Sequence, residues 1–328
     1  MWDRGQHEER RRPDELPGVI DTIGLAYTRL LARPWIVLGP VLLDLYLWLG
    51  LKVTAGPLML KIGEQVRPIE RIGASTADFI DRQEGFNLAE LLSFELFTVR
   101  MPTFFPSLAS DEPVRLQGWR PEFGDGPWWL LAALVPLLLL AGYTLGSAFL
   151  LAAGDVARGS APRFDARAWL STSYRLVLWL LASIGLLALL TWPLIVAQGV
   201  FIYAGSPPIN ILSFLMLFPA GVGFVLFFFS VFAIVLDGAT AGQAFRSSYR
   251  VVRADSWQAL AFIVSFMIVT GGFPFFWRVL ATVPPGTLIA IVGNAFVSTG
   301  MIVAGMIYYE DRAAVVDLSF PATEPGTA

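Results

Sequence analysis

Residues 127–152 read PWWLLAALVPLLLLAGYTLGSAFLLA, a stretch that contains no charged side chain. About 20 mostly apolar residues in a helix are enough to cross the hydrocarbon core of a bilayer. A helix also satisfies its own backbone hydrogen bonds, which lipid requires because no water is present there. This stretch therefore predicts a transmembrane helix.

Five further stretches have the same apolar character, at 34–53, 175–200, 211–236, 257–279 and 286–309. Aromatic residues of the kind that gather at membrane interfaces mark several ends of the six stretches: Trp35, Trp128, Trp129, Trp257, Trp277, Tyr308 and Tyr309. We expect an all-α fold, a polytopic integral membrane helix bundle with six transmembrane helices.

The composition of the whole chain agrees with this class. Its 328 residues are 55% hydrophobic and 15% charged, with a mean hydropathy of +0.63, which is too apolar for an ordinary soluble domain. The absence of cysteine excludes disulfides, iron–sulfur clusters, thiol nucleophiles and cysteine-type zinc sites. The only histidine is His7, and no carboxylates have metal-ligand spacing, so we expect no metal and no cofactor.

The positive charges between the apolar stretches predict the orientation. Arginines are frequent before residue 34 and in the segments 153–175 and 237–256, whereas 201–210 and 280–285 contain no Lys or Arg. Cytoplasmic loops carry an excess of Lys and Arg. We therefore expect a multi-pass protein of the inner (cytoplasmic) cell membrane with both termini in the cytoplasm, and no cleaved signal.

The segment 54–126 has the character of a soluble protein. Apolar spacing predicts an amphipathic helix over 57–72 and a second one after Asn87, which can cap it with Glu90 at the capping-box position. Loops longer than about 60 residues cross the membrane regardless of their charge. We expect an extracytoplasmic helical cap here, which either only covers the bundle or binds a ligand or partner.

Four further segments are predicted on the cytoplasmic side. They are a tail with an amphipathic helix over 1–33, amphipathic helices over 153–174 and 237–256, and a tail over 310–328. In the helix over 239–253, Asp237 is expected to cap the N-terminus. Arginines form a stripe that adjoins the face made by Ala241, Phe245, Tyr249 and Val252.

A repeated motif gives the six helices an internal order. Trp169-Leu-Ser-Thr-Ser-Tyr-Arg-Leu-Val runs into the third stretch, and Ala244-Phe-Arg-Ser-Ser-Tyr-Arg-Val-Val runs toward the fifth. The fainter Tyr27-Thr-Arg-Leu-Leu precedes the first. These repeats predict three parallel hairpins, each introduced by a cytoplasmic amphipathic helix, with the extracytoplasmic segment inserted in the first hairpin.

The stretch Val235-Leu-Asp-Gly-Ala-Thr-Ala-Gly-Gln-Ala-Phe-Arg-Ser-Ser-Tyr-Arg-Val-Val, followed by Trp257 and an apolar span, carries a resemblance to known families. It resembles a pattern in the six-helix membrane domain of glycerophosphoryl diester phosphodiesterase and in related uncharacterised polytopic membrane families. There an acidic/Gly turn leads into an Ala-x-x-x-Ser-aromatic-Arg/Lys helix. The resemblance implies the fold and a membrane location. The chain has no room for the soluble phosphodiesterase barrel, so no catalytic residue is carried over.

Asp44, near the middle of the first stretch, is the first candidate functional residue. A carboxylate at that depth costs roughly 2.5–3.5 kcal/mol on insertion scales, which makes a functional role the first hypothesis. Asn294 and Gln198 are its candidate intramembrane partners. Asp44 is either a buried structural hydrogen-bonding group or the proton- or cation-coupling site of a carrier.

Arginines of the cytoplasmic side form the second candidate site: Arg163, Arg167, Arg175, Arg246, Arg250 and Arg253. They either anchor the protein against anionic lipid or recognise a phosphate-bearing lipid or solute. No P-loop, nucleophile elbow, H-E-x-x-H or dinucleotide fingerprint is present, so no catalytic residue is predicted.

These observations favour a non-enzymatic integral membrane protein that binds lipid or a partner, or organises the membrane. The alternative is a small secondary carrier or channel that uses Asp44, and a lipid-modifying enzyme comes third. We expect the lipid bilayer and its anionic headgroups as partners, and no nucleic acid.

Overall fold

The structure, a computed structural model, describes residues 16–66, 86–93, 101–104, 122–123, 126–203 and 221–319. Several predictions lie outside the described residues, namely those for His7, for the ends of the two amphipathic helices of 54–126, for residues 211–220 and for the side chain of Gln198. Within the described part, the protein is all-α apart from two strands of two residues each.

Four helices are long and apolar enough to cross a membrane. They are α5 (Trp128–Ala157), α6 (Ala166–Tyr203), α10 (Ser256–Leu280) and α11 (Pro284–Ser319). A fifth crossing is possible where α1 (Val19–Leu31) meets the continuous helical stretch of η2 (Pro34–Val37) and α2 (Leu38–Leu49) at 94°. The protein is therefore a multi-pass helical membrane protein.

A shorter apolar helical stretch, Gly221–Asp237, comes before the fifth predicted span. Its last part is α8 (Ser230–Asp237), and α9 (Ala241–Ala254) follows after a tight turn. The described residues thus contain four candidate spans, or five if the bent pair counts as one, together with this shorter helix.

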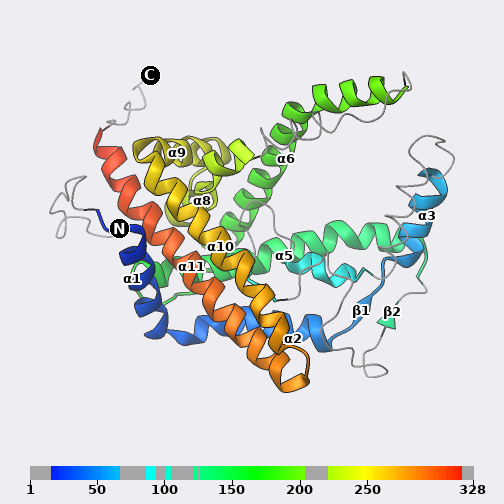
Figure 1. Cartoon of the computed structure of the whole chain (residues 1–328), viewed down its shortest axis with the longest axis horizontal. Helices are drawn as coiled ribbons and strands as arrows, with labels where there is room; N and C mark the ends of the chain where they lie inside the picture. Colours follow the sequence, from blue (N-terminus) through cyan, green and yellow to red (C-terminus); the bar gives the residue numbers. More distant parts are fainter. Residues whose placement is uncertain are drawn as a thin grey trace.

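The two ends of the described chain lie at one end of the molecule, beside α1 and α9 (Figure 1). Helix α3 (Gly56–Val66) and the strands β1 (Lys52–Val53) and β2 (Glu122–Phe123) lie at the opposite end. We call the first end the terminal face and the second the insertion face. Helices α10 and α11 run side by side between the two faces (Figure 1).

Helix α11 is the centre of the bundle, because it packs against α1, α2, α5, α8, α9 and α10. In the most apolar 18 residues of α11, 67% of the residues are buried within the protein. The corresponding fraction for α6, which lies at the rim of the bundle, is 6%. Where α8, α10 and α11 meet, a cluster of aromatic rings fills the core, with Tyr308 stacked on Phe229 and Phe262.

Helix α1 is amphipathic and packs its buried stripe, Thr22, Ala26 and Leu30, against the bundle. The hydroxyl of Tyr27 donates to the backbone oxygen of Val297 on α11 at 2.8 Å. The ring of Tyr27 lies directly over Gly300, where any side chain would overlap it. A glycine at this position therefore permits the close approach of α1 and α11.

The segment 54–126 is held together where it leaves and rejoins the bundle. Strand β1 pairs in parallel with β2, and Thr54 bridges to Asn87. The side-chain oxygen of Asn87 accepts from the N–H groups of Val53 (3.0 Å) and Ala89 (3.1 Å). Asn87 thus caps the helix that follows it, as predicted, although the described part of that helix, η3 (Leu88–Ser93), is 3-10 rather than α.

Helix boundaries on the terminal face differ from the prediction at 153–174. No separate amphipathic helix forms there, because residues 166–174 are the first turns of the single helix α6. Residues 166–184 contain no Gly or Pro that would interrupt the helix. In the second copy of the motif a break does occur, at Asp255, whose side chain accepts from the N–H of Gln258 and starts α10.

Residues 310–328 also differ from the predicted tail. Helix α11 continues past Tyr309 to Ser319, so the described part of this segment is helical.

Candidate functional site

Asp44 is completely buried, and its two carboxylate oxygens accept from the backbone N–H of Phe104 at 2.8 and 2.9 Å. The ring of Phe104 lies in a small cluster with Trp48 of α2, Ala281, and Ala290 and Ile291 of α11. We call the segment 54–126 the insertion. Its described residues 101–104 therefore enter the bundle, where a backbone N–H donates to the carboxylate of Asp44.

The predicted partners of Asp44 do not join it in the described part of the chain. Asn294 is buried on α11, but no hydrogen bond connects it to Asp44. The side chain of Gln198 lies outside the described residues. Sequence reasoning considered only polar side chains as partners and so missed the backbone of Phe104.

Arg175, one of the six predicted arginines, holds a helix end. Helix α8 finishes at Gly238, whose φ of 65° lies in the left-handed region that favours glycine. The guanidinium of Arg175 donates to the backbone oxygen of Gly238. Arg158 donates to the oxygen of Leu236 in the same turn at 2.7 Å. Two cations therefore satisfy the carbonyl end of α8, where the helix dipole favours positive charge.

Asp237 does not cap α9, contrary to the sequence prediction. It is the last residue of α8 and accepts a hydrogen bond from the hydroxyl of Tyr309 on α11 at 2.6 Å. Helix α9 begins instead with a capping box formed by Thr240 and Gln243. The pattern Thr240-x-x-Gln243 was present in the sequence and could have identified this start.

The three arginines of α9 are exposed. Arg246, Arg250 and Arg253 lie on the outer side of the helix, while Ala244, Ser248, Val251 and Val252 are buried. Tyr249, which the sequence pattern placed on one face with Ala241 and Val252, is also exposed, because the buried side of the helix is centred near Ser248. Helix α9 thus presents arginines and a tyrosine outward from the terminal face.

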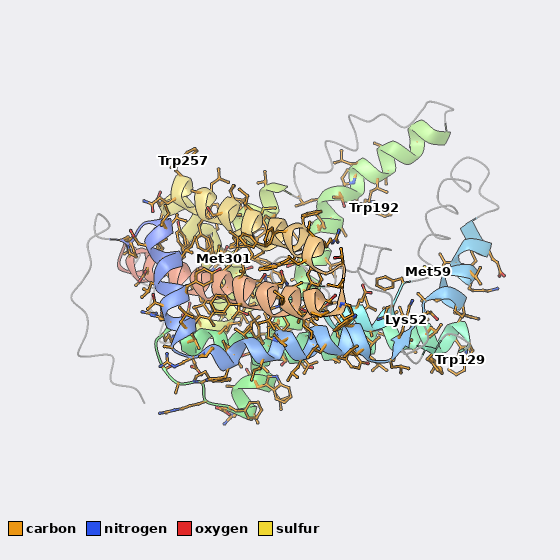
Figure 2. All side chains as sticks on the ribbon, turned by 60° about the horizontal axis from the view of Figure 1, so that its bottom comes forward. Lys52, Met59, Trp129, Trp192, Trp257 and Met301 are labelled. Carbon is orange, nitrogen blue, oxygen red and sulfur yellow. The ribbon has the colours of Figure 1, made fainter. Side chains whose placement is uncertain are left out.

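Arg163 and Arg167 form a second exposed group, at the start of α6. Between them Phe164 has 75% of its surface exposed. Trp257, at the start of α10, is 79% exposed and projects away from the bundle, whereas Met301 of α11 lies inside it (Figure 2). Exposed arginines and exposed aromatic rings are therefore close in sequence around the terminal face.

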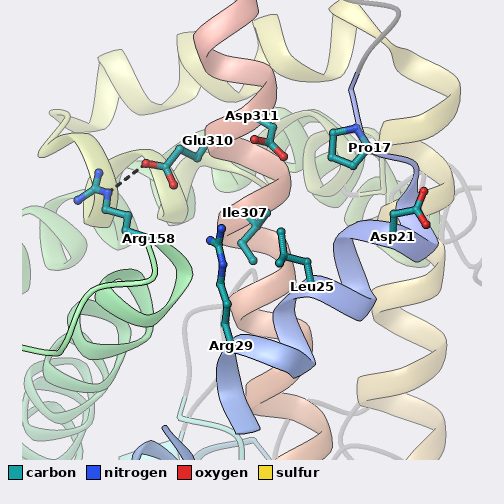
Figure 3. Close-up of a pocket in the computed structure, with 8 residues that line it drawn as sticks. All are labelled: Pro17, Asp21, Leu25, Arg29, Arg158, Ile307, Glu310 and Asp311. Atoms are coloured by element: carbon teal, nitrogen blue, oxygen red, sulfur yellow. Dashed lines mark hydrogen bonds and ion pairs between the residues drawn. The ribbon is translucent and has the colours of Figure 1, made fainter. Parts of the chain in front are cut away.

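A pocket of about 370 Å³ opens on the terminal face between α1, the end of α5 and α11 (Figure 3). Its lining is mostly charged: Pro17, Asp21, Leu25, Arg29, Arg158, Ile307, Glu310 and Asp311. Arg158 and Glu310 form an ion pair across it at 3.1 Å. Sequence reasoning missed this pocket, because its residues come from three distant parts of the chain.

Nothing in the described residues is arranged to hold a metal ion. The geometry defines a multi-pass α-helical membrane protein with two arginine-bearing surfaces and a charged pocket on one face. The chain belongs to the family described as a domain of unknown function, DUF7847, which matches residues 128–315. No curated protein and no solved structure matches the chain. The matched residues start with α5 and end within α11, so α1, α2 and the insertion lie outside them.

Proposed function

We propose that this protein is a non-enzymatic, six-span membrane protein whose terminal-face arginines bind anionic lipid headgroups. The single observation that carries the proposal is the outer side of α9, where Arg246, Arg250 and Arg253 are exposed beside Tyr249 while the opposite side is buried. An amphipathic helix with arginines and an aromatic ring outward suits the headgroup plane of a membrane.

Exposed aromatic residues support the same placement. Trp257 follows α9, and Phe164 lies between Arg163 and Arg167. Tryptophan and tyrosine are enriched at the level of the headgroups, because their apolar rings carry a polar N–H or O–H group, and phenylalanine is typical of the apolar side of this interface. The terminal face would then be the cytoplasmic face of the inner membrane, where arginines are also most frequent.

Two features support six spans in three parallel hairpins. The apolar stretch Gly221–Asp237 follows ten residues that are apolar in sequence, which together are long enough to cross. The repeated serines Ser173 and Ser248 are both buried, and both bond to the preceding helix, to Ser147 at 2.6 Å and to the oxygen of Leu226 at 2.7 Å. The membrane families that the motif around Asp237 resembles share the six-helix plan.

The geometry of Asp44 favours the structural reading over the carrier. Both of its oxygens accept from the N–H of Phe104, a contact that joins the insertion to α2. This contact gives the buried carboxylate a structural role.

The test is lipid retention by the full chain in native mass spectrometry. Replacing Arg246, Arg250 and Arg253 together with Gln is expected to lower retention of phosphatidylglycerol on the order of a hundredfold, since each exposed cation near an anionic surface contributes ~1 kcal/mol. The matched control is Arg278→Gln, an arginine at the other end of α10 that lies over the ring of Phe275. Equal retention by the triple variant and the control would contradict the proposal.

A further inference from the structure

The pocket between α1, α5 and α11 is lined by charges of both signs. Arg158 and Glu310 are paired with each other. In the described part of the chain, by contrast, the side chains of Arg29 and Asp21 form no hydrogen bond or ion pair. Two residues of helix α1, Arg29 and Asp21, therefore place a cation and an anion in the same cavity, and neither has a side-chain partner among the described residues.

These two charges lie at different ends of the pocket. Asp21, Leu25 and Arg29 are spaced four residues apart along one side of α1. In Figure 3 the side chain of Arg29 extends toward Ile307 on the Arg158 side, whereas Asp21 lies on the far side, near Pro17. Leu25 and Ile307 form an apolar floor between them. A second carboxylate, that of Asp311, also lines the pocket.

A ligand with a single charge would suit only half of this lining. An inorganic anion would be favoured by Arg29 but repelled by Asp21, and a simple cation would be favoured by Asp21 but repelled by Arg29. A group that carries an anion and a cation a few bonds apart satisfies both ends. The cavity of about 370 Å³ is near the lower end of the range for small-ligand sites, so it fits a compact polar group.

We propose that this pocket binds a zwitterionic phosphate–ammonium group, with the phosphate at Arg29 and the primary ammonium at Asp21. This is the chemistry of phosphoethanolamine, either free or as the headgroup of phosphatidylethanolamine. A guanidinium is well suited to phosphate oxygens, and a carboxylate accepts from an ammonium group in a charge-assisted hydrogen bond. The lipid form of the ligand rests on the proposed function, because it requires the terminal face to lie at the headgroup level.

The experiment measures binding of phosphatidylethanolamine and phosphatidylglycerol to the full chain in nanodiscs by native mass spectrometry. Soluble O-phosphoethanolamine is titrated separately and followed by thermal shift. The wild type is expected to prefer phosphatidylethanolamine at this site. Asp21→Asn should lower that preference on the order of tenfold and leave phosphatidylglycerol binding unchanged, because only the ammonium contact is lost.

Arg29→Gln should weaken retention of both lipids at the pocket, and Arg29→Lys should restore part of it because the cation is kept. Asp21 is exposed and Arg29 is half-buried, so neither change removes core packing, and equal unfolding temperatures serve as the check on folding. A thermal shift with soluble O-phosphoethanolamine, in the absence of any preference for phosphatidylethanolamine, identifies the free compound as the ligand. Unchanged lipid preference and an unchanged soluble titration in both variants would overturn the proposal, as would a site that prefers phosphatidylglycerol.

A negative result for ligand binding in this pocket can be distinguished from a negative result for lipid binding by α9. The triple α9 variant should lower phosphatidylglycerol retention and leave the phosphatidylethanolamine preference intact, whereas Asp21→Asn should have the opposite pattern. The two sites share no residue.

Discussion

Both carboxylate oxygens of Asp44 lie within hydrogen-bonding distance of one backbone N–H, that of Phe104, at 2.8 and 2.9 Å. The two residues are 60 positions apart, and the contact joins α2 to the insertion. Asp44 is fully buried and Phe104 is nearly so. The carboxylate therefore positions the insertion on the bundle, at a depth where an unsatisfied N–H would be costly.

Replacing Asp44 should destabilise the protein according to how much of this acceptor is lost. Asp44→Ala leaves the N–H of Phe104 without its acceptor and is expected to cost about 1–3 kcal/mol, while Asp44→Asn keeps one oxygen and should cost less. Unfolding in detergent checks the order, and protease digestion of the insertion checks its release. If Asp44→Asn instead retains full stability and abolishes proton-coupled uptake in liposomes, Asp44 is the coupling site of a carrier.

Gly300→Ala should weaken the contact between α1 and α11. The added methyl group would overlap the ring of Tyr27, and overpacking of this kind costs about 1–3 kcal/mol. The control is Gly185→Ala on α6, where no atom lies within 4 Å of the added methyl group. Thermal unfolding in detergent should separate the two variants, and equal stability would mean that α1 is not held at this point.

Gly238→Ala should destabilise the end of α8, since the left-handed conformation costs a residue with a Cβ about 1 kcal/mol and the methyl group would also meet Arg175. Gly242→Ala, in the first turn of α9, meets nothing within 4 Å and should be neutral or slightly stabilising. A denaturant titration measures the difference in the free energy of unfolding between the two variants. Equal values would mean that the turn after α8 tolerates other conformations.

The orientation can be tested directly, because the chain has no cysteine of its own. Single cysteines at Ile20, Ala161 and Gly242 should react with a membrane-impermeant maleimide from the cytoplasmic side, and one at Lys61 from the opposite side. Labelling of Ile20 and Lys61 from one side would show that α1 and α2 form a re-entrant loop. Labelling of Ala161 and Gly242 from opposite sides would remove one of the six spans.

The helices themselves were predictable, because crossing lipid requires long runs without charge. The stretches at 257–279 and 286–309 lie within α10 and α11, and the stretch at 127–152 starts at the N-cap of α5 and continues within that helix. The continuity of α6 was not predicted, since a change from polar to apolar residues does not end a helix unless a capping residue such as Asp255 is present.

The roles of individual charged residues were less predictable. Arg175 and Arg246 occur in similar segments, yet one satisfies a helix end and the other is exposed, because the difference depends on which helix packs alongside. The pocket could not be predicted from the sequence for a similar reason. Asp21, Arg158 and Glu310 are far apart in sequence, and only the packing of α1 and α5 on α11 brings them together.

The contact of Tyr27 with Val297 also constrains how the protein is made. The two residues are 270 positions apart, and a ribosome synthesises the chain from its N-terminus. The buried stripe of α1 consequently has no α11 to pack against until α11 has been translated. During that interval the apolar stripe of α1 must be covered by other means, and the headgroup layer of the membrane is the nearest medium that accepts an amphipathic helix. Helix α1 therefore completes its native packing long after it has left the ribosome.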